Sequence, residues 1–419
     1  MNKVIPALGV ISATLNNYNA YPYNVGFDIQ SVADLAWSLP THSWEFGAAA
    51  EAMLELYTPQ ASVFGVAPFP VPTISRKSNR ALEYVAKNAR LGSGSFDALD
   101  RGNGAAGDPA SMGVYAVMLG KTDDKYAEAA NRTVTGLLKD VPRFSNGAIS
   151  HRSAVPELWA DFQYMVPPFL AYYAADTDDE TLLRESVRQI RLYREVLQAK
   201  TSASYKGAWQ HIIGPESQDT GIWSSGNGWA AAGMTRVLAT VMKAPVALKA
   251  DWQKDAIEEL TGYIKEILDG AIGSSRDDGL LRNYWQDLTG PHGFGEISGS
   301  SLLASVAYRM AVIDPKTFGK QYIVFAEDMR KALAPHITAK GIATPSVNPL
   351  WWLDKKPFTT GSPEGQAFVV LMYAAYRDCI TADVCPRPAS EGSGSATRRA
   401  NKRDVHARRR ALHGDMHSN

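Results

Sequence analysis

An aspartate at the start of a strongly apolar segment is the residue best placed for chemistry in this sequence. Asp161 precedes an apolar run that reaches Leu170, with Trp159 and Met165 close to it. An aspartate in this position often only caps a helix, because its carboxylate accepts hydrogen bonds from the first turn. Aromatic and apolar neighbours would instead raise its pKa and suit it to act as a general acid. Since aromatic rings also match the flat faces of sugars, the stretch indicates carbohydrate chemistry.

A second aspartate, Asp108, has the matching position before another apolar segment. Pro109 follows it, which favours a capping role, and Asp100 and Arg101 precede it in a glycine-rich loop. The loop is no phosphate-binding motif, because no strand precedes it and no Gly-Lys-Ser ends it. Capping and contact with a substrate both remain open for Asp108.

Two histidines stand in loops near these acids. His151 and its neighbour Arg152 come ten residues before Asp161, and His211 follows Trp209. A single histidine is more often structural than catalytic. A His-Arg pair in the same loop as an acid could nevertheless bind an anionic sugar.

The most specific string in the chain runs from Trp223 to Trp229. Ser225 and Gly226 are small enough for the backbone to approach a ligand closely, and Asn227 offers an amide. The two tryptophans could stack on a sugar or fill the core. The ligand-binding interpretation is favoured for Trp223, and both remain open for Trp229.

Composition describes an ordinary globular protein with unusual ends. The 419 residues are 45% hydrophobic and 21% charged, with no formal net charge. We expect a signal peptide in residues 1–20, one catalytic domain in 21–388 and a disordered basic tail in 389–419. The two cysteines, Cys379 and Cys385, would form a disulfide in a secreted protein and be free in a cytosolic one. We expect secretion, from an imperfect signal sequence.

Helical periodicity recurs along the whole chain, and alternation typical of strands is almost absent. Twelve helices are predicted, and from the fourth onward apolar helices alternate with amphipathic ones, as buried helices alternate with covering ones. This pattern predicts an all-α fold, an (α/α)6 barrel of six helical hairpins, over an open α-solenoid. The predicted helices are Ile29 to Leu39, Phe46 to Tyr57, Ser78 to Asn88, Pro109 to Leu119, Tyr126 to Val141, Phe162 to Ala174, Asp179 to Leu197, Asn227 to Met242, Trp252 to Leu268, Ser300 to Ile313, Gln321 to Leu333 and Gly365 to Arg377.

The strings around Trp159 and from Trp223 to Trp229 resemble glycoside hydrolase family 105, the unsaturated rhamnogalacturonyl hydrolases, in a fungal-type version. The resemblance covers about Ile29 to Arg377 and implies an (α/α)6 barrel. It also implies removal of a 4,5-unsaturated uronic acid, galacturonyl or glucuronyl, from the non-reducing end of lyase-generated oligosaccharides. In that reaction Asp161 would protonate C4 of the enol ether and water would add at C5.

The same resemblance, together with the residue types, indicates the remaining site residues. Asp161 and Asp108 would be catalytic. His151, His211, Trp223 and Trp229 match substrate-contacting positions of the family. The residue types and their places in the loops add Arg152, Trp159, Met165, Ser225, Gly226 and Asn227 to the expected substrate-binding residues. Bacterial members have arginine, facing the sugar carboxylate, where this chain has Ser225. Either Arg152, Arg101 or His211 replaces that cation, or the enzyme accepts a different unsaturated uronide or linkage.

Two alternatives stay open at this point. One is an (α/α)6 polysaccharide lyase or inverting glycosidase that uses Asp108 and Asp161. The other is a non-catalytic carbohydrate-binding protein. No metal or organic cofactor is expected, because no cysteine, histidine or acid spacing resembles a zinc or calcium site. The mildly acidic body argues against a nucleic-acid partner, and neither a membrane nor an obligate protein partner is expected.

Overall fold

The computed structural model describes residues 19–387 and contains all twelve predicted helices. The predicted signal peptide (1–20) lies almost entirely outside the described residues, and the predicted tail (389–419) lies wholly outside them. The helices are α1 (Ile29–Ser38), α2 (Ser43–Tyr57), α3 (Arg80–Asn88), α4 (Gly113–Gly120), α5 (Asp124–Lys139), α6 (Phe162–Thr177), α7 (Glu180–Leu197), α8 (Ser224–Lys243), α9 (Gln253–Gly273), α10 (Ile297–Ile313), α11 (Lys320–Leu333) and α12 (Pro363–Thr381).

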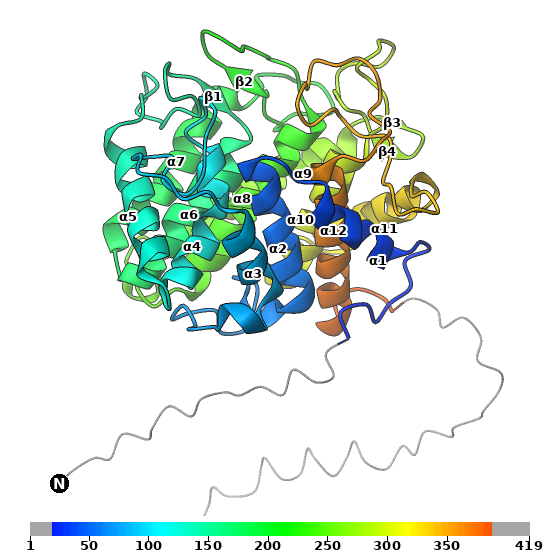
Figure 1. Cartoon of the computed structure of the whole chain (residues 1–419). Coiled ribbons are helices and arrows are strands. Elements are labelled where there is room, and N and C mark those ends of the chain that lie inside the picture. The colour runs from blue at the N-terminus through cyan, green and yellow to red at the C-terminus, as the bar shows by residue number, and fades with distance from the viewer. Residues whose placement is uncertain (1–18, 388–419) are drawn as a thin grey trace, which may run out of the picture. The chain divides into compact units, whose positions relative to one another are not determined.

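The even-numbered helices form an inner ring and the odd-numbered helices surround them (Figure 1). Neighbours pack in the order α6, α8, α10, α12 and α2, and the ring closes between α2 and α4 through the short 3₁₀ helix η4 (Asp108–Met112). The fold is therefore the predicted (α/α)6 barrel. The sequence pattern identified the inner helices only from α4 onward, and the structure adds α2 to them.

Burial explains why the two kinds of helix differ in sequence. Helix α10 is buried on almost every side, with residues Ile297 to Ala311 all inside the protein. Helix α7 buries one stripe, which includes Leu183 and Ile190, and leaves its charged face outside. A helix that is apolar all round lies in a core, whereas an amphipathic helix covers one.

All inner helices begin at the same end of the barrel, because each is joined to the next by an antiparallel outer helix. The loops at this end carry two short antiparallel sheets, β1 (Leu158–Trp159) with β2 (Ile212–Ile213), and β3 (Arg276–Asp277) with β4 (Leu280–Leu281). Both sheets lie at the upper end of the barrel in Figure 1. The loops before α4, α6 and α8 therefore gather their polar residues at this end.

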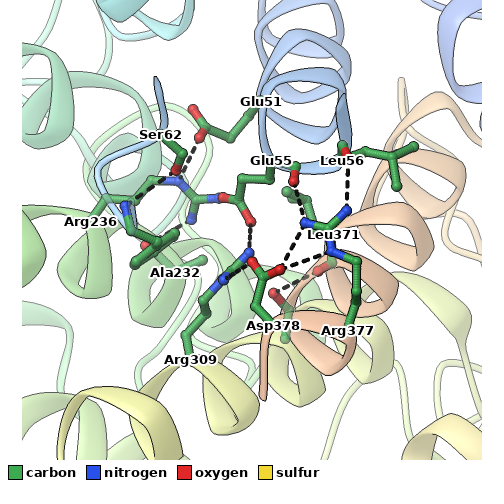
Figure 2. Close-up of polar contacts among 12 residues, drawn as sticks. Glu51, Glu55, Leu56, Ser62, Ala232, Arg236, Arg309, Leu371, Arg377 and Asp378 are labelled. Atoms are coloured by element: carbon green, nitrogen blue, oxygen red, sulfur yellow. Dashed lines mark hydrogen bonds and ion pairs between the residues drawn. The ribbon is translucent and has the colours of Figure 1, made fainter. Parts of the chain in front are cut away.

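A buried ionic network ties four inner helices together towards their C-terminal ends (Figure 2). Glu55 of α2 accepts hydrogen bonds from Arg236 of α8 at 2.6 Å and from Arg309 of α10 at 2.7 Å. Arg309 also donates to Asp378 of α12, which in turn accepts from Arg377. Paired in this way, the charges avoid the cost of isolated burial and fix the helices relative to one another.

Two further features concern the described part of the chain as a whole. Cys379 at the end of α12 forms a disulfide with Cys385. Among the described helices, none has the length and apolar composition needed to cross a membrane.

Candidate active site

A cavity of about 240 Å³ opens at the end of the barrel where the inner helices begin. Its lining comes from the loops before these helices and from a loop, residues 348–352, between α11 and α12. Eight of the twelve predicted site residues line it: Asp108, His151, Arg152, Trp159, Asp161, Met165, His211 and Trp223. The structure thus brings together residues from three separate loops.

Asp161 directly precedes α6, yet its side chain caps nothing. Its backbone is already in the α region, and no hydrogen bond joins its carboxylate to the first turn. The carboxylate faces His211 instead, with Oδ2 3.3 Å from Nε2. Oδ2 is buried and, apart from this contact with His211, has no hydrogen-bond partner among the described residues. A buried polar oxygen without a partner is costly, so Asp161 is available for a ligand rather than committed to the helix.

Strand pairing places Asp161 beside His211. Trp159 pairs with Ile212, and the Ala160 N–H donates to the His211 carbonyl at 2.9 Å. The side chains of His211 and of Asp161, which follows Ala160, therefore come from adjacent segments.

His211 is held from its other side by a carboxylate. Its Nδ1 lies 3.0 Å from Oδ2 of Asp219, which also accepts a hydrogen bond from the Tyr284 hydroxyl at 2.5 Å. Burial alone would lower the pKa of His211, but the Asp161 and Asp219 carboxylates raise it above its usual value. Burial alone would raise the pKa of Asp219, but His211, the Tyr284 hydroxyl and the Gly221 N–H together lower it. The arrangement Asp161–His211–Asp219 favours a protonated imidazole between two acids.

Asp108 stands in a different electrostatic environment. Burial, together with the charge of Asp161, raises its pKa to about 7, against a smaller opposing effect of Arg152. Its Oδ1 is 3.5 Å from Nε2 of His151, and burial lowers the pKa of that imidazole to about 4. Asp108 is the first residue of η4 and makes no side-chain cap. The cavity therefore combines an Asp108–His151 pair, whose neutral forms are favoured by burial, with a histidine beside Asp161 whose charged form is favoured by two carboxylates.

Aromatic rings form the walls. Trp159 stacks on His151 at 4.8 Å between ring centroids, and Trp352 meets Trp159 edge-on at 4.9 Å. Glu157 accepts the Trp159 indole N–H at 2.7 Å, and Trp223 donates its own to Asn283 at 2.9 Å. Indoles anchored in this way present rigid faces of the kind on which sugar rings stack.

The other four predicted residues lie behind the cavity rather than on its lining. Ser225 is fully buried, and Gly226 is packed so closely that an added Cβ would lie 3.1 Å from the Trp223 ring. Asn227 bonds to the backbone of Trp209 and Trp223, while Trp229 packs against Phe368 in the core. Contact between these four residues and a substrate stays a prediction. In the structure, Asn227 holds two backbone segments together and Trp229 packs in the core.

Several lining residues escaped the sequence analysis. Trp44 is the second residue of α2. It donates its indole N–H to Glu364 of α12 at 2.8 Å, and both residues line the cavity. Both residues lie at the start of an inner helix. This position would have indicated Trp44 as a lining residue if the sequence pattern had identified α2 as an inner helix. Asp219 carries no local signal, since only the fold brings it to His211.

Comparison with known proteins agrees with this architecture. A model of Glycosyl Hydrolase Family 88 matches residues 79–346. None of the curated proteins matches the chain. Among solved structures, a possible GH105 member from Salmonella enterica serovar Paratyphi A has 14% identity and a TM-score of 0.65, covering 90% of this chain and 100% of that one.

Two further solved structures share the fold at 12% identity. The unsaturated glucuronyl hydrolase of Bacillus sp. GL1 has a TM-score of 0.56, covering 83% of this chain and 94% of that one. A GH76A α-1,6-mannanase from Salegentibacter sp. HEL1_6 has a TM-score of 0.58, covering 85% of this chain and 100% of that one. At such identities these likenesses show the fold alone, whereas the family match spans most of the barrel and includes both candidate acids. The chain belongs to glycosyl hydrolase family 88.

Proposed function

We propose that this hydrolase removes a 4,5-unsaturated uronic acid from the non-reducing end of lyase-generated oligosaccharides, as members of family 105 do. The observation that carries the proposal is the Asp161 carboxylate: it lines the cavity, caps no helix and has one unpartnered oxygen 3.3 Å from His211. Hydration of an enol ether needs a group that first gives a proton and then takes one. An acid in contact with a histidine can do both.

The proton resides in the Asp161–His211 pair. In the empty, wetted cavity the charged form of the pair, with the proton on His211, is supported by Asp219. A bound sugar displaces water, and a less polar environment favours the neutral form, in which the proton is on Asp161. Binding of substrate would thereby prepare the acid.

The reaction then follows in balanced steps. Asp161 transfers its proton to C4, and the positive charge that develops at C5 is shared with the ring oxygen. Water adds to C5 and returns a proton to the Asp161 carboxylate. The resulting hemiketal opens by breaking the bond between C5 and the ring oxygen, which gives a ketone at C5 and a hemiacetal at C1. This hemiacetal breaks down to an aldehyde as its hydroxyl proton passes to the leaving oxygen, which releases the neighbouring sugar and leaves the enzyme in its starting form.

The neighbouring groups supply binding and orientation. Arg152 lines the cavity, and its buried Nε has no hydrogen-bond partner among the described residues. We assign it to the substrate carboxylate, in place of the arginine absent at Ser225. The protonated Asp108 donates a hydrogen bond to the bound sugar, and Trp159 and Trp223 pack on the ring. The C4=C5 double bond removes the stereocentre that distinguishes galacturonic from glucuronic acid, so the two kinds of substrate differ in the neighbouring sugar and its linkage, which the assay below compares.

The test is loss of the ultraviolet absorbance of the double bond when the purified protein meets unsaturated galacturonyl and glucuronyl disaccharides. Asp161→Asn should lower the rate by about 10³-fold, the order of magnitude of one general acid–base group. Asp251→Asn, a change at an exposed aspartate, is the matched control. If the wild-type protein left every unsaturated disaccharide intact, the proposal would be wrong, and saturated oligosaccharides would then test the lyase and inverting-glycosidase alternatives by product analysis.

We also propose that the protein is secreted, because fragments of polysaccharides are found outside the cell. The Cys379–Cys385 disulfide is compatible with an oxidising compartment. N-terminal sequencing of the protein from the culture medium would test cleavage near residue 20, and retention of an intact N-terminus inside the cell would contradict it.

A further inference from the structure

A second, smaller cavity adjoins the catalytic one and has a different chemical character. It encloses about 170 Å³, is almost entirely polar, and shares His42 and Asn103 with the catalytic cavity. Asn103 is exposed and therefore stands at the rim. The two cavities are therefore neighbours, and the smaller one lies at the start of α2, where Thr41, Ser43 and Phe46 line it.

Two arginines give this smaller cavity its charge. Arg90 and Arg101 both line it, and among the described residues neither guanidinium hydrogen-bonds to a side chain or forms an ion pair. Both are exposed residues, and two arginines of the outer helix α7 show the contrasting case, since Arg191 and Arg194 are each paired with a glutamate. Unpaired guanidiniums that face a cavity are available to an anionic ligand.

The single acid in the cavity does not neutralise these charges. Asp100 is 5% exposed, and its Oδ1 accepts the Arg101 backbone N–H at 2.6 Å. Burial raises the pKa of Asp100, although the two guanidiniums oppose the rise. Two positive charges thus face at most one negative charge. The buried Ser43 hydroxyl also lines the cavity and has no hydrogen-bond partner among the described residues.

We propose that this cavity binds an acidic group, a carboxylate or a sulfate, on the sugar that the reaction releases. The proposal rests on the hydration reaction above, because the unsaturated uronic acid would occupy the catalytic cavity and its neighbour would project to the rim. Arg90 and Arg101 bind the anionic group, and Ser43 donates a hydrogen bond to it. The preferred substrate then has acid groups on both of its first two sugars.

Three unsaturated disaccharides test this subsite: one with a neutral second sugar, one with a uronic acid there and one with a sulfated sugar. In the wild-type protein, the acidic disaccharides should have a KM about 10-fold lower than the neutral one, in line with one or two hydrogen bonds to a charged group. In Arg90→Gln/Arg101→Gln the ratio of the acidic to the neutral KM should rise about 10-fold. Added salt should reduce the preference of the wild-type protein. The carboxylate and sulfate substrates identify which anion is bound.

The control is Arg184→Gln, which removes an exposed arginine from the outer helix α7 and should leave the KM ratio unchanged. Equal KM values for neutral and acidic disaccharides would overturn the subsite while the hydration reaction stood. If no disaccharide reacted, calorimetric titration with a saturated galacturonate trisaccharide would still decide. The subsite requires binding that weakens about 10-fold in the double variant, and equal binding by both proteins would refute it.

Discussion

At the scale of single residues, Asp108 and Asp161 are distinguished by their partners rather than by their own chemistry. Asp161 faces an imidazole whose pKa is raised, and Asp108 faces one whose pKa is lowered to about 4. Pairs of acids with unlike environments commonly divide the donor and acceptor roles between them. Neither side chain caps a helix, so the difference between their environments arises from the tertiary structure.

Asp108→Asn tests the neutral state of this acid. Because the pKa of Asp108 is raised to about 7, the folded protein keeps the carboxyl protonated at pH values where the unfolded chain has lost the proton. Its contribution to stability is complete below the unfolded pKa and is lost as the pH rises through about 7. Thermal unfolding should therefore show the variant gaining stability relative to wild type between pH 4 and pH 7.5. A stability difference independent of pH would contradict this assignment.

The same variant also tests the proposed hydrogen bond from Asp108 to the substrate. Loss of the Asp108 proton should lower kcat/KM of the wild type above about pH 7. Asn can donate the bond at every pH, so this decline should weaken or disappear in the variant. An inactive but folded variant would show instead that Asp108 acts as a base.

Asp219→Asn tests how His211 is positioned. Without the carboxylate the pKa of His211 falls, so the alkaline decline of kcat should move to lower pH and kcat should drop about 10-fold, part of the usual general acid–base contribution. Tyr284→Phe removes only one hydrogen bond to Asp219 and should have a smaller effect. An unshifted pH profile in Asp219→Asn would mean that Asp219 has only a structural role.

At the scale of elements, the start of α8 illustrates how a loop holds the cavity wall. The Asn227 amide joins the backbone of Trp209 and Trp223, so one side chain connects the loop that carries His211 with the first turn of α8. Polar groups left unpaired in a buried site cost about 1–3 kcal/mol each.

Asn227→Ala should therefore lower the free energy of unfolding by about 3 kcal/mol and raise KM by displacing Trp223. Chemical denaturation measures the first effect, and steady-state kinetics the second. Gln30→Ala, at an exposed position of α1, should change stability by less than about 0.5 kcal/mol. Equal stability of the two variants would argue against the structural role of Asn227.

At the scale of the whole barrel, the ionic network at the end away from the cavity joins helices that are remote in sequence. Glu55 lies 181 residues from Arg236 and 254 from Arg309. Glu55→Ala leaves two buried guanidiniums without this partner, which should cost about 3–5 kcal/mol. Glu259→Ala breaks a partly exposed pair with Arg191 and should cost at most about 1 kcal/mol. Denaturant titration of the two variants compares the costs directly, and similar losses would contradict the role given to the network.

The sequence by itself determined the twelve helices, the alternation of buried and amphipathic ones from α4 onward, and eight of the residues that line the cavity. These follow from local properties, namely a period of 3.6 residues and the clustering of polar and aromatic residues in the loops before buried helices. Eight predicted site residues meet in the cavity for that reason.

Only the tertiary structure decided the rest. It placed α2 in the inner ring, brought Asp219 to His211, opened the arginine-lined cavity beside the catalytic one, and moved Asn227 and Trp229 behind the wall. Asp161 and Asp108 differ in environment for the same reason. Each of these outcomes depends on contacts between segments that are distant in sequence, and such contacts exist only once the ring of helices has closed.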